Sequence, residues 1–252
     1  MKKRIRVIIS LGILLTVIVC SVAIGKYEKN ISVYSDIKQP IYRVQKDEKE
    51  ISITFDINWA EEEHLYEILE ILKSNDVKAT FFIMGGWVNY SEENREKLIK
   101  IYEEGHEIGN HSYIHPIFTN ITENKMKEEI EKTENVFLEV LGEKSTLFRF
   151  PSGAYDDKSI GIVESMGYKC IQWDVDSVDW KGESAEKEYR RVMDNVQNGS
   201  ILLFHNNSKY TEENLKRIIP ELKEEGYEFK PVGDLILDGN YSINGNGEQY
   251  KK

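Results

Sequence analysis

Short apolar runs alternate with longer amphipathic segments from about residue 51 to residue 232. Residues 51–55 form a β-branched and aromatic run that is typical of a buried strand. Residues 61–74 follow, with apolar side chains at helical spacing. The same order recurs, and it predicts further strands at 79–83, 107–109, 148–150, 170–173, 201–204 and 228–232 and further helices at 91–104, 122–140, 157–166, 185–196 and 211–225.

This alternation also predicts how the strands are connected. A strand that is followed by a helix and then by another strand implies parallel pairing with right-handed crossovers. Seven such units suit a (β/α) barrel better than an open doubly wound sheet. No glycine-rich phosphate loop follows the first strand, which argues against a nucleotide-binding fold. We therefore predict an α/β protein, a (β/α) barrel with about seven parallel strands.

The pattern divides the chain into four parts. Residues 1–25 begin with four basic side chains and continue with an uncharged apolar stretch, which predicts a signal anchor or a cleaved signal peptide. The positive charge before this stretch predicts that the rest of the chain lies outside the membrane. Residues 26–48 are polar and are predicted to be a stalk, 49–237 to be the folded domain, and the Gly- and Asn-rich segment 238–252 to be a flexible tail.

Charge excludes one class of partner. Without the four basic residues before Val7, the net charge changes from −11 to −15. We expect no nucleic-acid partner, because phosphates require a basic surface. Cys170 is the only cysteine after the apolar stretch, so the domain has no intrachain disulfide.

Chemically active side chains follow several of the predicted strands. His111 and His115 are four residues apart, so both can reach one cation such as zinc; the alternative is two exposed histidines in a polar loop. Asp56 ends the first strand and can act as a general base. Its alternative role, a helix cap, suits Asn58 better.

Two further strand ends carry candidates for acid catalysis and for positioning. His205 can donate a proton to a leaving amine, with Asp179 or Asp176 as the carboxylate that keeps it protonated. The alternative for these aspartates is a solvated loop. Arg149 can pair with a catalytic carboxylate, and a backbone N–H near Ser152 can support an oxyanion, although a purely structural arginine explains this segment equally well.

In order, these motifs read Thr-Phe-Asp, His-Ser-x-x-His, Arg-x-Pro-x-Gly, Asp-x-Asp-Ser-x-Asp-Trp and Leu-x-x-His. Over residues 49–236 the chain resembles the polysaccharide deacetylase family, also called the NodB homology or carbohydrate esterase 4 family. The resemblance implies a distorted (β/α) barrel and a divalent metal bound by one aspartate and two histidines. It also implies hydrolysis of acetyl groups on chitin, peptidoglycan, xylan and related polymers.

The same resemblance assigns roles to individual residues. It implies Asp56 as the catalytic base, His205 as the acid, Asp179 as the carboxylate that tunes this acid, and Arg149 as the residue that positions the base. It implies His111 and His115 as ligands of a metal that we expect to be zinc. Ser152, Trp180 and Leu202 are expected to contact substrate, with Trp180 and Leu202 walling the acetyl pocket.

One position departs from the family pattern. The first motif of the family normally continues with a second aspartate, the third metal ligand, whereas this chain has Ile57. An isoleucine cannot bind a metal, so we expect weakened or absent metal binding. The run Thr-Phe-Asp-Ile-Asn-Trp is similar to the sporulation-associated subgroup of these deacetylases, which suggests a role in spore cortex or envelope peptidoglycan.

Three functional hypotheses follow. The first is an exported N-deacetylase of cell-wall polysaccharide, anchored in the membrane or secreted, at the bacterial surface or in the spore envelope. The second, motivated by Ile57, is a weak or inactive wall-binding protein that keeps the fold. The third is another carbohydrate-active barrel hydrolase, in which Asp56 and Asp176 form a carboxylate pair across a glycosidic bond; it leaves both histidines unexplained.

Overall fold

The computed structural model describes residues 38–252. The predicted signal segment at 1–25 and the first part of the predicted stalk lie outside this range. Within the range that the structure describes, no helix combines the length and the apolar character needed to cross a bilayer.

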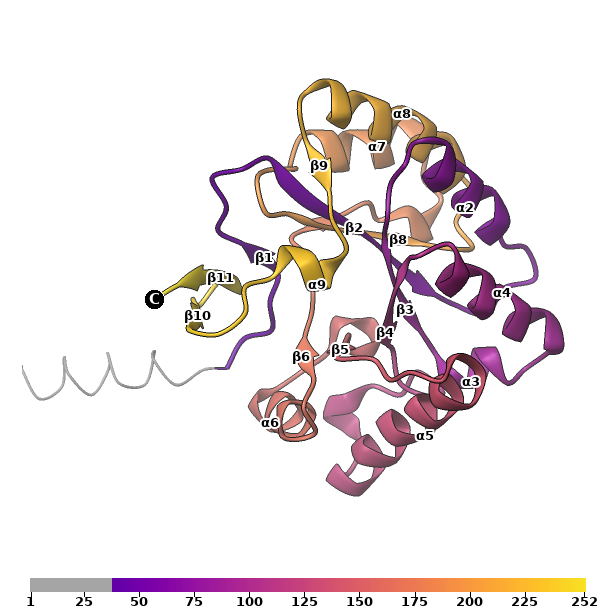
Figure 1. The fold of residues 1–252 in the computed structure, drawn as a ribbon, viewed down its shortest axis with the longest axis vertical. Helices are drawn as coiled ribbons and strands as arrows, with labels where there is room; N and C mark the ends of the chain where they lie inside the picture. Colours follow the sequence, from indigo (N-terminus) through magenta and orange to yellow (C-terminus); the bar gives the residue numbers. More distant parts are fainter. Residues whose placement is uncertain (1–37) are drawn as a thin grey trace, which may run out of the picture. The chain divides into compact units, whose positions relative to one another are not determined.

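A curled sheet of parallel strands forms the centre of the domain (Figure 1). Seven strands follow one another in the order β6-β5-β4-β3-β2-β8-β7, and β9 pairs with the start of β2. The bounds are β2 Glu50–Ile57, β3 Thr80–Ile83, β4 Glu107–Asn110, β5 Leu147–Phe148, β6 Lys169–Cys170, β7 Val175–Asp176, β8 Ile201–His205 and β9 Glu228–Phe229. The sheet is open between β6 and β7, so the barrel is incomplete. The predicted α/β fold with about seven parallel strands is confirmed.

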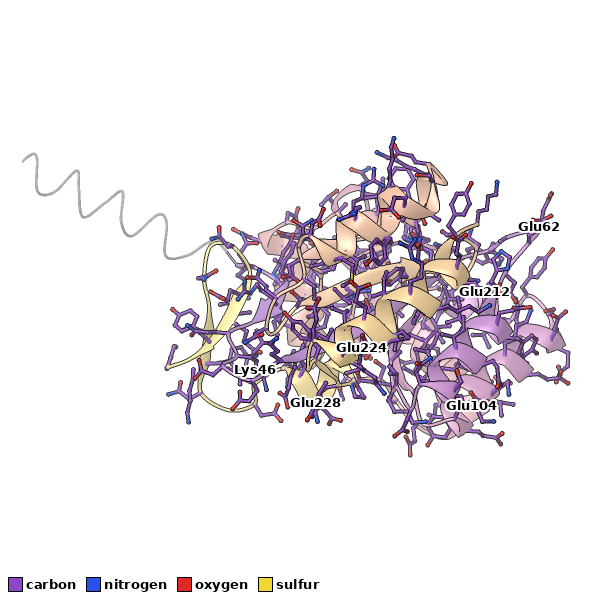
Figure 2. All side chains as sticks on the ribbon, turned by 90° about the horizontal axis from the view of Figure 1, so that it is seen from above. Lys46, Glu62, Glu104, Glu212, Glu224 and Glu228 are labelled. Carbon is purple, nitrogen blue, oxygen red and sulfur yellow. The ribbon has the colours of Figure 1, made fainter. Side chains whose placement is uncertain are left out.

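Helices cover the outer face of this sheet (Figure 1). They are α2 Leu65–Ser74, α3 Gly85–Val88, α4 Glu92–Glu103, α5 Glu123–Leu141, α6 Asp157–Ser165, α7 Ala185–Met193 and α8 Thr211–Glu224, with 3-10 turns η1 Phe118–Asn120, η2 Pro151–Gly153 and η3 Asp179–Lys181. The short helix α9 Val232–Leu235 instead packs with Phe82, on the inner face of the sheet. The side chain of Ser91 accepts a hydrogen bond from the Asn94 N–H, and Thr122 does the same for Lys125, so α4 and α5 begin where the sequence predicts. Acidic side chains such as Glu62, Glu224 and Glu228 project from the outside of the domain (Figure 2).

The alternation of side chains along β2 decides which of its residues face the interior of the curled sheet and which face the helices. Ile53, Phe55 and Ile57 belong to the apolar core that also contains residues of α2, α4, α7 and α8. Thr54 and Asp56 point to the opposite face, where both contact Arg149. Position 57 therefore faces the helical layer and not the interior of the curl.

The C-terminal segment differs from the prediction. Residues 238–252 were expected to be a flexible tail, but they contain β10 Tyr241–Ile243 and β11 Glu248–Lys251, which pair with each other. Strand β11 also pairs with β1 Arg43–Val44, so the end of the predicted stalk belongs to the folded domain. The buried Gln249 side chain bonds the backbone of Leu237 in both directions, which fixes this small sheet in place. A short polar hairpin has no apolar run, so its composition resembles that of a disordered tail.

Candidate active site

A cavity of about 400 Å³ opens where the carboxyl ends of the parallel strands meet. Active sites of (β/α) barrels lie at this edge. Ten residues line it: Asp56, Asn58, His111, His115, Ser152, Trp173, Asp176, Trp180, Leu203 and His205. Six of the nine predicted site residues are among them, and two of the remaining three, Arg149 and Asp179, lie buried directly behind lining residues.

Asp56 is held by a buried arginine. The Arg149 guanidinium donates to Asp56 Oδ1 at 2.8 Å and to Thr54 Oγ1 at 2.8 Å, and it lies 3.9 Å from the centre of the Phe82 ring. Burial alone would raise the pKa of Asp56, but the charge of Arg149 and its hydrogen bond, together with the neighbouring His111 and His205, outweigh burial and lower it. The Asp56 carboxyl is therefore ionised at neutral pH and faces the cavity.

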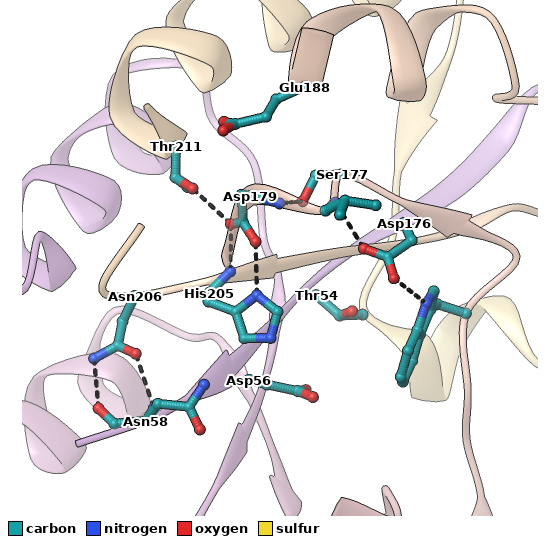
Figure 3. A network of polar contacts seen from close by, with 12 residues as sticks. Thr54, Asp56, Asn58, Asp176, Ser177, Asp179, Glu188, His205, Asn206 and Thr211 are labelled. Atoms are coloured by element: carbon teal, nitrogen blue, oxygen red, sulfur yellow. Dashed lines mark hydrogen bonds and ion pairs between the residues drawn. The ribbon is translucent and has the colours of Figure 1, made fainter. Parts of the chain in front are cut away.

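His205 is held by a buried carboxylate (Figure 3). The Asp179 carboxylate accepts from the His205 ring Nδ1 at 2.7 Å, from the His205 backbone N–H at 2.8 Å and from the Thr211 hydroxyl at 2.7 Å. Burial would lower the pKa of His205, but the hydrogen bond and negative charge of Asp179, together with the nearby charges of Asp56 and Asp176, outweigh burial and raise it. Because Asp179 takes Nδ1, the ring presents Nε2 as its other polar atom.

The sequence left two carboxylates open as the partner of His205, and the structure assigns Asp179. Asp176 instead accepts from the Trp173 indole N–H at 3.2 Å and from the Val178 N–H at 2.7 Å. Val178 has φ 54°, a left-handed conformation that a β-branched residue adopts only under strain. This strained turn separates the two aspartates and directs them to different partners.

The two histidines meet in a loop after β4. Their ring centres lie 4.9 Å apart, and His115 has a left-handed φ of 62°. Glu129, buried on α5, accepts from the backbone N–H of Tyr113 at 3.0 Å and of Ile114 at 2.9 Å, which fixes the loop.

The tautomer of His111 follows from its neighbour. His111 Nδ1 lies 2.9 Å from the Arg149 carbonyl oxygen, which can only accept a hydrogen bond. In the neutral ring Nδ1 therefore carries the proton and Nε2 carries none. This Nε2 lies 3.5 Å from Asp56 Oδ2. Burial lowers the pKa of His111 to about 4, so the ring is neutral at neutral pH.

These residues do not complete the expected metal site. A catalytic zinc site uses three protein ligands, and no group of three His, Cys, Asp or Glu side chains within residues 38–252 is placed to hold an ion. Ile57 faces the apolar core, and the residue that lines the cavity beside it is Asn58, whose amide is neutral. Two imidazoles alone do not fit a resident zinc ion.

Two of the three residues predicted to contact substrate line the cavity, and the third does not. Ser152 lines the cavity with a left-handed φ of 56°, and Trp180 lines it with 61% of its surface exposed. Leu202 is wrong as a wall residue, because it packs in the apolar core, and Leu203 lines the cavity instead. Side chains alternate along a strand, so the position two residues before His205 faces the same way as His205. That rule would have selected Leu203 from the sequence.

Comparison with known proteins shows which family this chain is similar to. A family profile described as polysaccharide deacetylase matches residues 43–171. The chain is 32% identical to the peptidoglycan-N-acetylmuramic acid deacetylase PdaA of Bacillus subtilis, over 76% of this chain and 73% of that protein. It is 33% identical to the peptidoglycan-N-acetylglucosamine deacetylase PgdA of Listeria monocytogenes, over 80% of this chain but only 42% of that protein.

A solved structure from Bacillus anthracis is also similar, and it is described as a pseudoenzyme of carbohydrate esterase family 4. It superposes with a TM-score of 0.73 at 35% identity, over 78% of this chain and 68% of that chain. A mutant of that protein, described as having restored enzymatic activity, superposes equally well, with a TM-score of 0.73. The chain is therefore similar both to named deacetylases and to a relative described as a pseudoenzyme.

Proposed function

This chain belongs to the polysaccharide deacetylase family, and on that basis we propose that it removes N-acetyl groups from cell-wall polysaccharide with a low turnover. One observation carries the proposal. A carboxylate held by an arginine, Asp56, and an imidazole held by a carboxylate, His205, line the same cavity. This pair provides a base and an acid for hydrolysis of an amide.

In the proposed reaction Asp56 acts first. Its ionised carboxyl takes a proton from a water molecule, and the water oxygen attacks the acetamide carbonyl carbon. Arg149 keeps Asp56 ionised and fixes its orientation through the 2.8 Å contact. His111 Nε2, 3.5 Å from the other carboxylate oxygen, borders the same region.

His205 completes the reaction. Its Nε2 gives a proton to the sugar nitrogen as the C–N bond breaks, which releases acetate and a free amine. Asp179 supports this role because it raises the pKa of His205, which favours the protonated ring at the start of the step. The backbone N–H of Ser152, in the cavity wall, is proposed to stabilise the oxyanion.

Low turnover follows from the incomplete ligand set. Deacetylases of this family are generally metal-dependent, but the two histidines of this cavity lack a third protein ligand among the described residues. General acid–base catalysis contributes about 10²–10⁴-fold, and one oxyanion donor about 10²–10³-fold. Both effects together leave the reaction slower than one that also uses a Lewis acid.

Acetate release tests the proposal. The protein is incubated with acetylated peptidoglycan or with chitin oligomers, and acetate is measured. We expect slow release that falls at least 100-fold in Asp56→Asn and in His205→Ala. The matched control is Asp76→Asn. Asp76 is exposed and lies outside the cavity, and its left-handed backbone conformation is one that asparagine also tolerates. A folded protein that releases no acetate from any polymer contradicts the proposal.

A second candidate function is binding of cell-wall glycan without turnover. Ile57 in place of the usual aspartate and the 35% identity to a relative described as a pseudoenzyme favour it. The two candidates differ in one measurement: a binding protein retains polymer affinity and releases no acetate.

The proposed site of action is the cell surface. The basic start and the apolar stretch in residues 1–25 support export, with an anchor or a cleaved signal as the two alternatives. The named relatives, described as peptidoglycan deacetylases, support the cell wall as the location, and the first-motif similarity supports a role in the spore envelope. Protease treatment of intact cells tests export, because an exported domain is degraded and a cytoplasmic one is protected.

A further inference from the structure

Gln172 is a buried amide beside the cavity. It lies two residues after β6 and directly before the lining residue Trp173, and only 1% of its surface is exposed. Its side-chain oxygen has no hydrogen-bond partner within residues 38–252, so the amide is held by its nitrogen alone. A buried amide that is only half satisfied contributes little to stability. This favours a role in placing a neighbouring group over a role in stabilising the core.

The main chain of Gln172 contacts the arginine that holds the base. Arg149 Nη2 donates to the Gln172 carbonyl at 3.1 Å, while Nη1 of the same guanidinium donates to Asp56 at 2.8 Å. The Gln172 backbone N–H donates to the Ile41 carbonyl at 2.7 Å. The main chain of Gln172 is thus fixed on both sides, and one of these contacts helps to orient Arg149.

The side chain of Gln172 contacts a different part of the cavity wall. Its Nε2 donates to the Gly153 carbonyl at 3.1 Å. Because a carbonyl oxygen can only accept, the amide must turn its nitrogen and not its oxygen toward Gly153. Gly153 directly follows Ser152, whose backbone N–H is the proposed oxyanion donor. A single residue therefore connects the arginine behind the base to the turn that carries this donor.

The turn at Ser152 and Gly153 has an unusual backbone. Both residues are left-handed, with φ of 56° and 64°, and Ser152 has no glycine's freedom to adopt this conformation. The Gly153 N–H donates to the Phe150 carbonyl at 2.9 Å, which closes the turn from within. Residues in sparsely populated conformations persist only when their surroundings fix them. The Gln172 amide supplies such a contact from outside the turn.

The residue after Gln172 also restricts the turn. A Cβ atom at Gly153 would lie 3.0 Å from Cη2 of Trp173, so a larger residue would have to displace the indole. Gln172 and Trp173 therefore contact the turn together, the first by a hydrogen bond and the second by packing.

We propose that Gln172 is a positioning residue for hydrolysis of the acetamide: its amide holds the turn so that the Ser152 N–H faces the oxyanion, and its carbonyl holds Arg149 behind the base. The inference rests on the proposed function and specifies it further. Because one residue contacts the group behind the base and the turn with the oxyanion donor, the separation of base and donor is fixed. Gln172 does not line the cavity, so it acts through these neighbours.

Acetate release by the full chain measures this role. Gln172→Met keeps the side chain close to its length and removes the amide, while the carbonyl contact to Arg149 remains. We expect kcat to fall about tenfold or more, since loss of one oxyanion donor costs about 10²–10³-fold and a displaced donor loses part of that. KM should stay within about twofold, because the contact serves the transition state and not the bound polymer. The pH profile of kcat should keep its shape, since Asp56 and His205 retain their partners.

Two further variants separate positioning from stability. Gln249→Met is the matched control, because Gln249 is also buried, lies on β11 outside the cavity lining, and bonds the backbone of Leu237 in both directions. It is expected to lower the melting temperature and to leave kcat unchanged. Gln172→Asn keeps an amide but shortens the side chain by one carbon. It should therefore lose the Gly153 contact and lower kcat as Gln172→Met does.

Amide hydrogen exchange tests the hold on the turn without depending on turnover. The Gly153 N–H is protected by its bond to the Phe150 carbonyl, and local opening of the turn exposes it. We expect it to exchange about tenfold faster in Gln172→Met than in the unaltered protein. Its exchange in Gln249→Met should be unchanged.

An unchanged kcat or an unchanged Gly153 exchange rate in Gln172→Met would overturn the inference and leave the proposed function standing. The same holds for an equal fall of kcat in Gln249→Met, which would show a general loss of stability. A pH profile that shifts in Gln172→Met would mean that the side chain acts on Asp56 or His205 and not on the turn, which also overturns it. No acetate release from any polymer by the folded, unaltered protein would overturn the proposed function as well.

Discussion

The carboxylate of Asp179 holds His205 at two points, at the ring Nδ1 with a distance of 2.7 Å and at the backbone N–H with a distance of 2.8 Å. Two contacts from one buried group fix both the position of β8 at its end and the tautomer of the ring. Asp179 thus both orients the imidazole and favours its charged form.

We expect Asp179→Asn to lower the pKa of His205. The neutral amide loses the charge that favours the imidazolium, while its oxygen can still accept one of the two hydrogen bonds. Titration of the His205 ring followed by NMR should therefore show a midpoint below that of the unaltered protein. Acetate release, where it is measurable, should fall by about 10²-fold. An unchanged His205 midpoint in a folded variant would contradict the assigned pairing.

Position 58, and not position 57, is expected to restore a metal site. Asn58 lines the cavity with His111 and His115, whereas Ile57 packs in the apolar core. We expect Asn58→Asp to add the third ligand, so that zinc raises the melting temperature of this variant and a chelator reverses the rise. The same zinc concentration should change the unaltered protein little.

Ile57→Asp is the matched control for that experiment. It introduces the same carboxylate one residue earlier, on the face of β2 that contacts the helices. An uncompensated carboxylate there should destabilise the fold by about 2–5 kcal/mol. Zinc should not recover this loss. A zinc-dependent rise in Ile57→Asp, or none in Asn58→Asp, would contradict the orientation of β2.

Much of the site was predictable because it depends on strand ends. An aspartate or histidine directly after an apolar run must lie at the carboxyl edge of a parallel sheet, and this places Asp56 and His205 in one cavity from sequence alone. The motif order then identified Arg149, which pairs with Asp56 as predicted.

The site assignments that the sequence left open or gave wrongly depend mostly on local backbone geometry, which a pattern of apolar residues does not report. Leu202 is an exception, because the alternation of side chains along β8 already puts Leu203, and not Leu202, on the face that carries His205. The choice between Asp176 and Asp179 depends on the left-handed turn at Val178, which no residue preference predicts. Strand β7 is only two residues long and lies in an acidic run, so it has no strand signal of its own.

The buried pair of Asp56 and Arg149 makes a prediction about stability. Removing one partner leaves the other charge buried without compensation, which costs about 3–5 kcal/mol. Arg149→Met should therefore strongly lower the free energy of unfolding, measured by denaturant titration. Adding Asp56→Asn to this variant should recover part of the loss, because the stranded carboxylate is removed. Simple additivity of the two single losses would show that the pair does not interact.

Glu188 provides a pH-dependent test that is independent of catalysis. This residue of α7 is 1% exposed, and its carboxyl accepts from the Asn214 side chain at 3.1 Å. Burial, together with the negative charge of Asp179, raises its pKa from 4.5 to about 7. The folded state therefore binds this proton more tightly than the unfolded state, so stability falls as pH rises between these two values.

We expect Glu188→Gln to stabilise the protein more at pH 8 than at pH 5, because the glutamine never carries the charge that burial disfavours. The difference between the two gains should be about 2 kcal/mol, measured as free energy of unfolding at each pH. Glu62→Gln, at an exposed glutamate, is the control and should give no pH-dependent gain. An equal gain from Glu188→Gln at both pH values would mean that folding does not raise the pKa of Glu188.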